Sequence, residues 1–138
     1  MIEFKIENKL ITPEELNKFE LEIELSLPED YKAHMLKYNG GTPLSYYFYF
    51  GEPEDGIRLS YFFSIEYGAL LVEKQDYLPK MHISIGKTET GYLSMSLDEE
   101  NFGAIYVYYS EVELELIATS FTEFLNGLID YSDDFENQ

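Results

Sequence analysis

The 138-residue sequence contains no cysteine and only two histidines, His34 and His82. The lack of cysteine excludes disulfide bonds, thiolate catalysis and zinc sites built from thiolates. A metal centre would need converging histidine or carboxylate ligands at a recognisable spacing, and the two histidines share no such local pattern. We therefore expect neither a bound metal nor any other cofactor.

Basic residues are also scarce. Nine Lys and Arg stand against 27 Asp and Glu, which gives a formal net charge of −18 and a pI near 4.2. No Lys or Arg follows Lys87, whereas acidic residues continue to Glu136. A field of this sign repels nucleic-acid phosphates and anionic lipid headgroups and attracts cationic surfaces. The charge argues against nucleic acid or a membrane as partner and favours a basic protein.

Long apolar runs are missing as well. The N-terminal stretch MIEFKIENKL has no continuous apolar core of the signal-peptide type, and nowhere do the roughly 18 apolar residues needed for a membrane span follow one another. We therefore expect a cytoplasmic protein. With 45% apolar and 17% aromatic residues, the chain is long enough to bury a core unaided. We expect one domain over residues 1–138, with a frayed acidic tail at 131–138.

Two helices are predicted near the N-terminus. Thr12-Pro13, followed by Glu15, is typical of an N-cap, a first-turn proline and a capping box, and the apolar period then runs to about Leu25. Pro28 begins a second helix that Asp30 is expected to cap. Asn39-Gly40-Gly41 ends it with residues that tolerate positive φ.

A third helix is predicted near the C-terminus, where Ser120 is an N-cap and Glu123 occupies the capping-box position for a helix through Leu128. Between these helices the pattern is that of strands, with turns at 51–56 and 87–91. The expected strands span residues 43–50, 57–65, 92–97, 103–109 and 114–118, and a further strand through Ile83 and Ile85 forms a hairpin with 92–97. The segment 66–78 fits either a short helix or a buried strand, and we favour the helix.

This order of elements predicts an α+β fold. We expect a mostly antiparallel sheet of about five or six strands, with the two N-terminal helices and the C-terminal helix packed on it.

No local motif carries an obvious chemistry. His34 lies on the apolar face of the second helix, where a partly buried, hydrogen-bonded imidazole is the ordinary outcome, and His82 is expected to face solvent or a loop. Ser84, Ser94 and Ser96 lack the flanking glycines of a nucleophile elbow. With so many carboxylates, proximity in sequence identifies no acid–base pair. We expect a protein that is not an enzyme.

Acidic and tyrosine-rich segments are the candidate contact sites. Asp98-Glu99-Glu100 fails the calcium-loop pattern and reads as a solvated loop. Glu111, Glu113 and Glu115 alternate along one expected strand face, which fits either a protected sheet edge or a docking surface for Lys and Arg. The tyrosines of two strands form either a second buried face or an exposed aromatic patch. The candidate partner-binding residues are Tyr47, Tyr49, Asp98, Glu99, Glu100, Tyr106, Tyr108, Glu111, Glu113 and Glu115.

Several short sequence blocks between about Ile11 and Leu128 resemble the SUKH superfamily. Each block alone is a weak signal, but their order and spacing are those of the family. In chain order they are Glu20, Leu27-Pro28-Glu29-Asp30-Tyr31, Asn39-Gly40-Gly41, Ile83-Ser84-Ile85-Gly86, Gly91-Tyr92-Leu93-Ser94, Gly103-Ala104-Ile105-Tyr106 and Ile117–Leu125. One departure is the turn before the middle strand, where the family often has a Gly-Gly or Gly-Asn pair and this chain has Thr90-Gly91.

The resemblance implies an α+β domain without a known catalytic centre. For bacterial members it implies an immunity protein that binds a cognate polymorphic or contact-dependent toxin domain. Many such toxins are nucleases with basic clefts, which an acidic inhibitor would reach quickly and occlude. The yeast relatives, regulators of cell-wall assembly, imply the alternative of an intracellular regulatory scaffold that binds host proteins. For either partner we expect the protein to be a monomer or a weak dimer.

Overall fold

A computed structural model of the chain describes residues 3–43, 46–49, 56–109 and 113–130. The expected turn residues 51–55, the expected tail 131–138, and Phe50 and Glu111 lie outside these ranges. The described residues have an α+β fold, which confirms the expected class.

Seven strands of the described chain form an antiparallel sheet in the order β8-β7-β6-β5-β4-β3-β9. These strands are β3 (Tyr46–Tyr49), β4 (Gly56–Phe62), β5 (His82–Thr88), β6 (Tyr92–Ser96), β7 (Ile105–Tyr108), β8 (Glu115–Ala118) and β9 (Leu128–Asp130). A separate antiparallel pair is formed by β1 (Phe4–Lys5) and β2 (Thr42–Pro43). The sheet is therefore slightly larger than the five or six strands expected.

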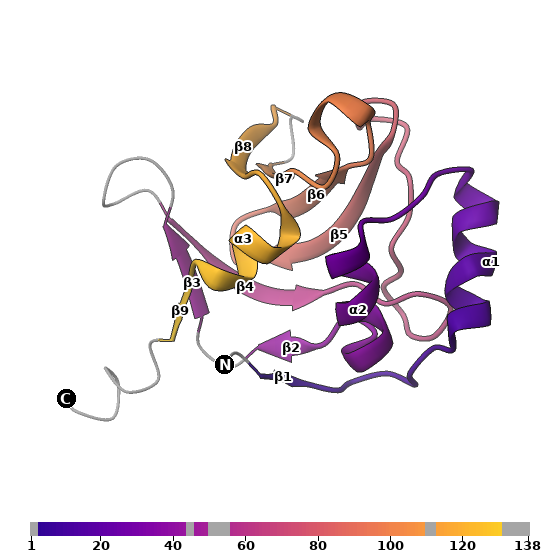
Figure 1. The fold of residues 1–138 in the computed structure, drawn as a ribbon. Coiled ribbons are helices and arrows are strands. Elements are labelled where there is room, and N and C mark those ends of the chain that lie inside the picture. Colours follow the sequence, from indigo (N-terminus) through magenta and orange to yellow (C-terminus); the bar gives the residue numbers. More distant parts are fainter. Residues whose placement is uncertain (1–2, 44–45, 50–55, 110–112, 131–138) are drawn as a thin grey trace.

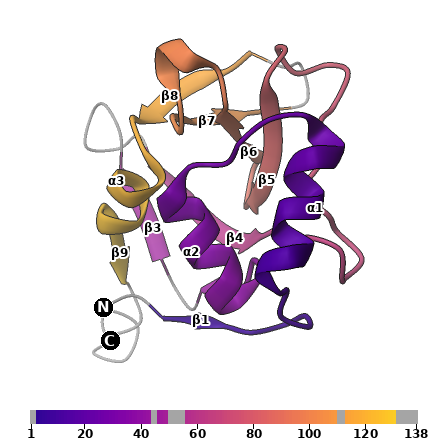
Figure 2. The same cartoon turned by 45° about the vertical axis from the view of Figure 1, so that its right-hand side comes forward.

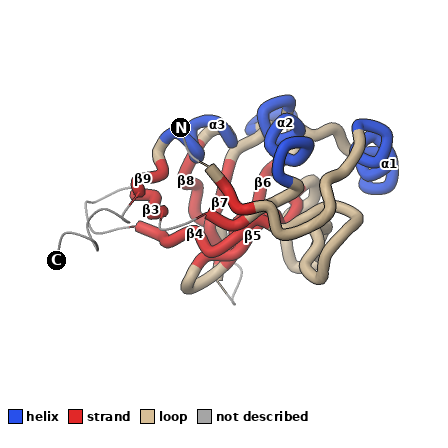
Figure 3. Tube along the Cα trace, turned by 90° about the horizontal axis from the view of Figure 1, so that it is seen from below, coloured by secondary structure: helices blue, strands red, loops and turns tan. Residues whose placement is uncertain are grey.

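The helices α1 (Pro13–Ile23), α2 (Glu29–Tyr38) and α3 (Phe121–Asn126) all lie on one face of this sheet. Figure 2 shows α1 and α2 in front of the strands, and Figure 3 shows the helical layer above the sheet. In the part of the chain that the structure describes, no helix has the length and apolar character needed to cross a membrane.

The core fills the space between these two layers. Helical side chains with at most 3% exposure meet strand side chains that are equally buried. The helices contribute Leu16, Tyr31, Met35, Phe121 and Phe124, and the strands contribute Ile57, Leu59, Ile83, Ile85, Leu93, Met95, Ile105 and Val107.

The helix ends follow the local signals in the sequence. The Glu15 N–H donates to Thr12 Oγ1 at 3.1 Å, and the Thr12 N–H donates to Glu15 Oε1 at 3.0 Å, which confirms the capping box of α1. At the end of α2, Asn39 takes the left-handed conformation with φ 43°, as expected for this position.

The side chain of Asn39 also forms hydrogen bonds to distant backbone groups, which the sequence pattern did not predict. Its Nδ2 donates to the carbonyl oxygens of Lys9 and Ile65 at 2.9 and 3.0 Å, and its Oδ1 accepts from the Ile65 N–H at 2.8 Å. The side chain is fully buried. It therefore fixes two distant segments against the end of α2.

The expected cap of α2 by Asp30 is wrong. The N-cap position is Pro28, which has no side chain that can accept a hydrogen bond. Asp30 lies within the first turn, where its Oδ1 accepts from the Tyr31 N–H at 2.8 Å, and its Oδ2 accepts from the backbone N–H and the hydroxyl of Thr122, at 2.9 and 2.8 Å. The carboxylate thus ties the first turn of α2 to the first turn of α3, a contact between residues 92 positions apart.

The last helix ends earlier than expected. Ser120 Oγ accepts from the Glu123 N–H at 3.0 Å, which confirms the N-cap of α3. The helix stops at Asn126, and Leu128 begins β9 by pairing with Phe48 of β3. A pairing between such distant segments overrides the local apolar period that favoured a longer helix.

The favoured helix at 66–78 is also wrong. The segment is an extended loop that pairs with strand ends on both sides, Leu71 bridging to Ser64 and Glu73 to Ser84. The Val72 N–H donates to the Ser64 carbonyl at 2.8 Å, and the Ser84 N–H donates to the Glu73 carbonyl at 2.9 Å. These backbone groups find partners outside the segment, so they form no helical turns.

Two glycines differ in the space that the surrounding structure leaves for a Cβ atom. Gly40 and Gly103 both have left-handed φ, +97° and +87°. A Cβ on Gly40 would lie 2.8 Å from the carbonyl oxygens of Phe62 and Phe63, whereas a Cβ on Gly103 would meet only a side-chain carbon of Pro28 at 3.4 Å. We expect Gly103→Ala to lower the free energy of unfolding by about 1 kcal/mol, and Gly40→Ala by about 3 kcal/mol or more. Urea denaturation of both variants measures the difference, and equal losses would contradict the steric argument.

Candidate partner-binding face

The sheet face that carries no helix is rich in tyrosine. We call it the outer face. The strand register places Tyr61 beside Lys87, Lys87 beside Tyr92 and Tyr92 beside Tyr108, in one row from β4 to β7. The next pair in the register, Leu93 with Val107, is buried in the core under the helices. Because neighbouring residues of a strand point to opposite faces, the row belongs to the outer face.

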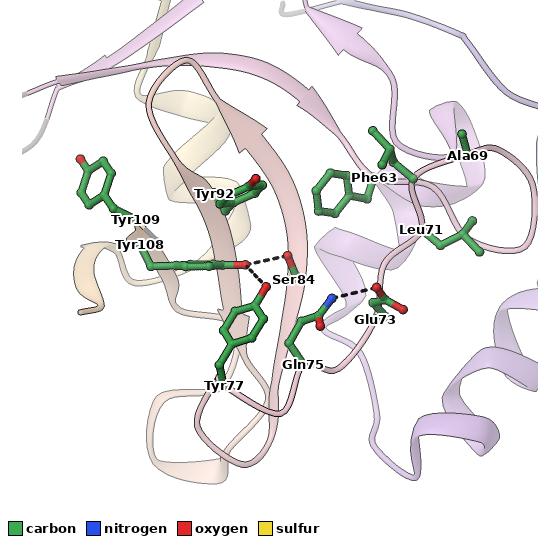
Figure 4. A pocket seen from close by; sticks show the side chains of 11 residues that line it. Phe63, Ala69, Leu71, Glu73, Gln75, Tyr77, Ser84, Tyr92, Tyr108 and Tyr109 are labelled. Atoms are coloured by element: carbon green, nitrogen blue, oxygen red, sulfur yellow. Dashed lines mark hydrogen bonds between the residues drawn. The ribbon is translucent and has the colours of Figure 1, made fainter. Parts of the chain in front are cut away.

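A cleft of about 550 Å³ opens on this face, between the 66–78 loop and the strands β5 to β7. Figure 4 shows its floor, where the hydroxyls of Ser84 and Tyr108 lie 3.0 Å apart and those of Tyr108 and Tyr77 3.5 Å apart. Phe63 and Leu71 form an apolar wall on the loop side. The cleft is therefore amphipathic, with hydroxyls beneath and hydrocarbon on one side.

The rings around the cleft are packed to different degrees. Tyr92 stacks on Tyr108 with centroids 5.5 Å apart, and Lys87 Nζ lies 4.7 Å from the Tyr92 centroid. The rings of Tyr92 and Tyr108 are therefore held in place by packing contacts. Tyr77 and Tyr109 keep about half of their surface in solvent, 51% and 45% exposed.

The charge at the cleft is negative. Glu73 lines it with an exposed carboxylate, which accepts from Gln75 Nε2 at 2.8 Å. No lysine or arginine is among the described lining residues. Lys87 is turned toward the hairpin, where its Nζ donates to the carbonyls of Thr88 and Gly91 at 2.9 and 3.3 Å.

The cleft hydroxyls are not set up as nucleophiles. Burial raises the pKa of Tyr108 well above its ordinary value, so the phenol stays protonated at neutral pH. Ser84 has a tyrosine hydroxyl, not a base, beside its oxygen. The arrangement is suited to hydrogen bonding, stacking and cation binding.

His82 is buried, so the expectation that it faces solvent or a loop is wrong. Its Nδ1 lies 2.8 Å from Ser94 Oγ, and its ring packs against Tyr106 with centroids 5.2 Å apart. Burial lowers the pKa of His82, an effect that the charge of Asp98 opposes. Ser94 has no exposed surface, so the hydrogen bond of this Ser–His pair lies inside the fold.

His34 is buried and hydrogen-bonded, as expected from the sequence. Its Nε2 donates to the Gly40 carbonyl at 2.7 Å, and the rings of Phe4, Phe62 and Phe121 surround it with centroids 4.9 to 5.2 Å away. Burial lowers the pKa of His34 to about 4. The imidazole is therefore neutral at pH 7 and part of the core.

The four candidate tyrosines all lie on the outer face, but toward different ends of the sheet. Tyr47 and Tyr49 on β3 stack with centroids 5.7 Å apart, and the Tyr47 hydroxyl donates to Glu89 Oε1 at 3.1 Å. Tyr106 is half-buried and Tyr108 is fully buried on β7. Only Tyr108 reaches the cleft.

The candidate acids come from two different segments of the described chain. Asp98, Glu99 and Glu100 lie at the short 3₁₀ helix η1 (Glu99–Asn101), where Asp98 Oδ1 accepts from the Glu100 N–H at 3.1 Å. The expected acidic strand face is wrong for the described residues, because Glu113 precedes β8 and only Glu115 lies within it. Glu111 lies outside the described residues.

Most of the residues that line the cleft were not predicted from the sequence. Ser84 and Tyr92 were recognisable from the alternation of side chains along the hairpin strands. Tyr92 pairs with Tyr108, and Ser84 pairs through Ser94 with Tyr106, so both share the face of these tyrosines. Glu73 and Tyr77 had no such signal, because they come from the segment that we expected to be helical.

The comparisons with known proteins identify the family. The model of the SMI1 / KNR4 family (SUKH-1) matches residues 10–127, which span all three helices and the strands from β2 to β8. The chain belongs to this family. No curated protein and no solved structure matches it significantly.

SUKH-1 membership confirms the resemblance seen in the sequence blocks. It supports an immunity or regulatory role and implies protein partners, such as toxins. The match includes both walls of the outer-face cleft.

The buried His34 makes the stability of this SUKH-1 domain depend on pH. The unfolded chain protonates His34 near pH 6.5, whereas the folded chain does so only near pH 4. Stability from this group is complete above pH 6.5 and is lost as pH falls toward 4, by on the order of 3 kcal/mol. His34→Gln keeps a side-chain donor for the Gly40 carbonyl but does not titrate.

The free energy of unfolding of the wild type, minus that of His34→Gln, should therefore decrease between pH 6.5 and pH 4 and level off below. Denaturant titrations at a series of pH values measure this difference, and the carboxylates common to both proteins cancel in it. A difference that stays constant with pH would refute the assignment.

Proposed function

We propose that this SUKH-1 protein is a non-enzymatic immunity protein, which binds a cognate toxin domain and neutralises it by covering its active site. The observation that carries the proposal is the net charge of −18 in a chain of this family. An excess of acids of this size is a poor match for nucleic acid or lipid and a good match for a basic protein surface.

The most suitable partner is a basic nuclease. Such an enzyme holds its substrate phosphates in a positively charged cleft, and an acidic protein competes for that cleft directly. Long-range attraction raises the association rate of oppositely charged proteins, which is the property that protection against a toxin requires. The exposed tyrosines and leucines of the outer face, among them Tyr77, Tyr109 and Leu71, supply contact area once the partner has arrived.

The first experiment is binding to the toxin-like domain encoded beside this gene. We expect a one-to-one complex of nanomolar Kd at about 50 mM salt, and an association rate at least about tenfold lower at 500 mM, because screening removes the steering. Stopped-flow mixing measures the rate. An unchanged rate would refute the electrostatic mechanism, and the absence of binding to any such domain would refute the immunity role.

A matched pair of charge variants locates the attraction. One variant carries Asp98→Asn, Glu99→Gln and Glu100→Gln at η1, and the other carries Glu14→Gln, Glu22→Gln and Glu24→Gln on the exposed side of α1. Both remove the same number of charges. A larger loss of association rate in the first variant places the contact near η1, whereas equal losses show that net charge alone steers the partner.

The alternative is an intracellular regulatory scaffold that binds host proteins, which SUKH-1 membership supports equally well. Affinity capture with the same protein separates the two roles. Recovery of several housekeeping proteins and no toxin favours the scaffold, whereas recovery of one toxin domain favours the immunity protein.

A further inference from the structure

We propose that the outer-face cleft is the anchor site for an arginine side chain of the partner protein. The inference rests on the proposed protein-binding function and adds the chemistry of the contact. It commits to arginine because the cleft combines an apolar wall, exposed aromatic rings and a single described carboxylate.

The shape of the cleft suits a long side chain with a charged end. Phe63 and Leu71 line one wall with hydrocarbon, against which the three methylene groups of an arginine can pack. The hydroxyls of Ser84, Tyr108 and Tyr77 lie at the floor and can accept from guanidinium N–H groups. A volume of about 550 Å³ leaves room for the side chain and for water.

The electrostatics favour a cation. Glu73 places a carboxylate at the cleft, and no basic side chain among the described lining residues neutralises it. That carboxylate accepts a hydrogen bond from the neutral amide of Gln75, which leaves its negative charge in place. The phenols of Tyr77 and Tyr109 present exposed ring surface, on which a planar guanidinium stacks better than an ammonium does.

The molecule already contains one contact of this type. Lys87 Nζ lies 4.7 Å from the centroid of Tyr92, at the edge of the same cleft. That lysine is held by the backbone carbonyls of Thr88 and Gly91, so it does not enter the cleft. The chain has a single arginine, Arg58, on β4, so a partner is the natural source of the guanidinium.

A second copy of this chain is a poor occupant. Two molecules of charge −18 repel each other, and each would present the same acidic face to the other. A basic partner has the opposite charge, so complementarity selects it over self-association.

The test uses the full-length protein and short capped peptides. Ac-Ala-Arg-Ala-NH₂ is titrated into isotopically labelled protein, with the matched peptides that contain citrulline, lysine or leucine in place of arginine. The backbone amide signals of Glu73, Ser84 and Tyr92 report on the cleft, and those of α1 report on the remainder of the surface. Citrulline keeps the shape of arginine and removes its charge.

We expect saturable shifts at the cleft amides with the arginine peptide, binding about threefold weaker with lysine, and binding about tenfold weaker with citrulline or leucine. Leucine binding as well as arginine would overturn the proposal and make the cleft an apolar socket. The lack of saturable shifts up to about 50 mM arginine peptide, roughly fiftyfold above a Kd of about 1 mM, would also overturn it.

Two variants with matched controls identify the groups. Glu73→Gln should weaken arginine-peptide binding about fivefold, whereas Asp76→Asn, which removes the same charge from the same loop outside the cleft, should leave it nearly unchanged. Tyr77→Leu should weaken it about threefold, and Tyr49→Leu, at a tyrosine on β3 that is 41% exposed against 51% for Tyr77, should not. Equal effects within either pair would refute the assignment.

The peptide experiment needs no toxin, so the two proposals fail separately. Specific arginine binding without a toxin partner would support the arginine site in the cleft and refute the immunity role. A tight toxin complex whose affinity is unchanged by Glu73→Gln and Tyr77→Leu would support the immunity role and refute the arginine site.

Discussion

The side-chain amide of Asn39 holds three backbone groups of two segments that are far apart in the sequence. It binds the carbonyl of Lys9 on the approach to α1 and both backbone groups of Ile65, just beyond β4. The amide is fully buried, so removing it would leave these groups unsatisfied in the interior, where each costs roughly 1–3 kcal/mol. Since Ile65 directly precedes the 66–78 loop, the same bonds fix where one wall of the outer-face cleft begins.

The arrangement of layers decides which surface is available to a partner. Three helices cover one face of the sheet, and most of the buried apolar side chains lie on that side. The outer face keeps the alternate positions of the same strands, which carry tyrosine, serine and lysine. A residue such as Tyr92 is therefore adjacent in sequence to the core residue Leu93 and still faces away from it. This alternation lets a packed core and an open contact surface share the same strands.

The sequence predicted those features whose causes lie within a few residues. The Thr12–Glu15 box, the Ser120 cap and the left-handed Asn39 are set by neighbours in the chain, and all three were confirmed. The helix expected at 66–78 was wrong because the partners of this segment, Ser64 just beyond β4 and Ser84 within β5, are brought together only in the folded chain. The burial of His82 and the strand β9 depend on similarly distant contacts. Of the residues that line the cleft, only Tyr108 was named from the sequence as a binding residue, because the loop side depends on contacts that are distant in the chain.

The pairing of β3 with β9 has a consequence for how the chain is made. Strand β3 (residues 46–49) pairs with β4 on one side and with β9 on the other. Strand β4 is synthesised soon after β3, but the residues of β9, 128–130, leave the ribosome much later. Until then, one edge of an almost completed sheet is a run of four aromatic residues with unpaired backbone groups, an arrangement that invites association with other nascent chains. Synthesis of the last strand closes that edge within the molecule. A chain that is cut short before Leu128 would keep its helices and most of its sheet and would still be at risk of aggregation.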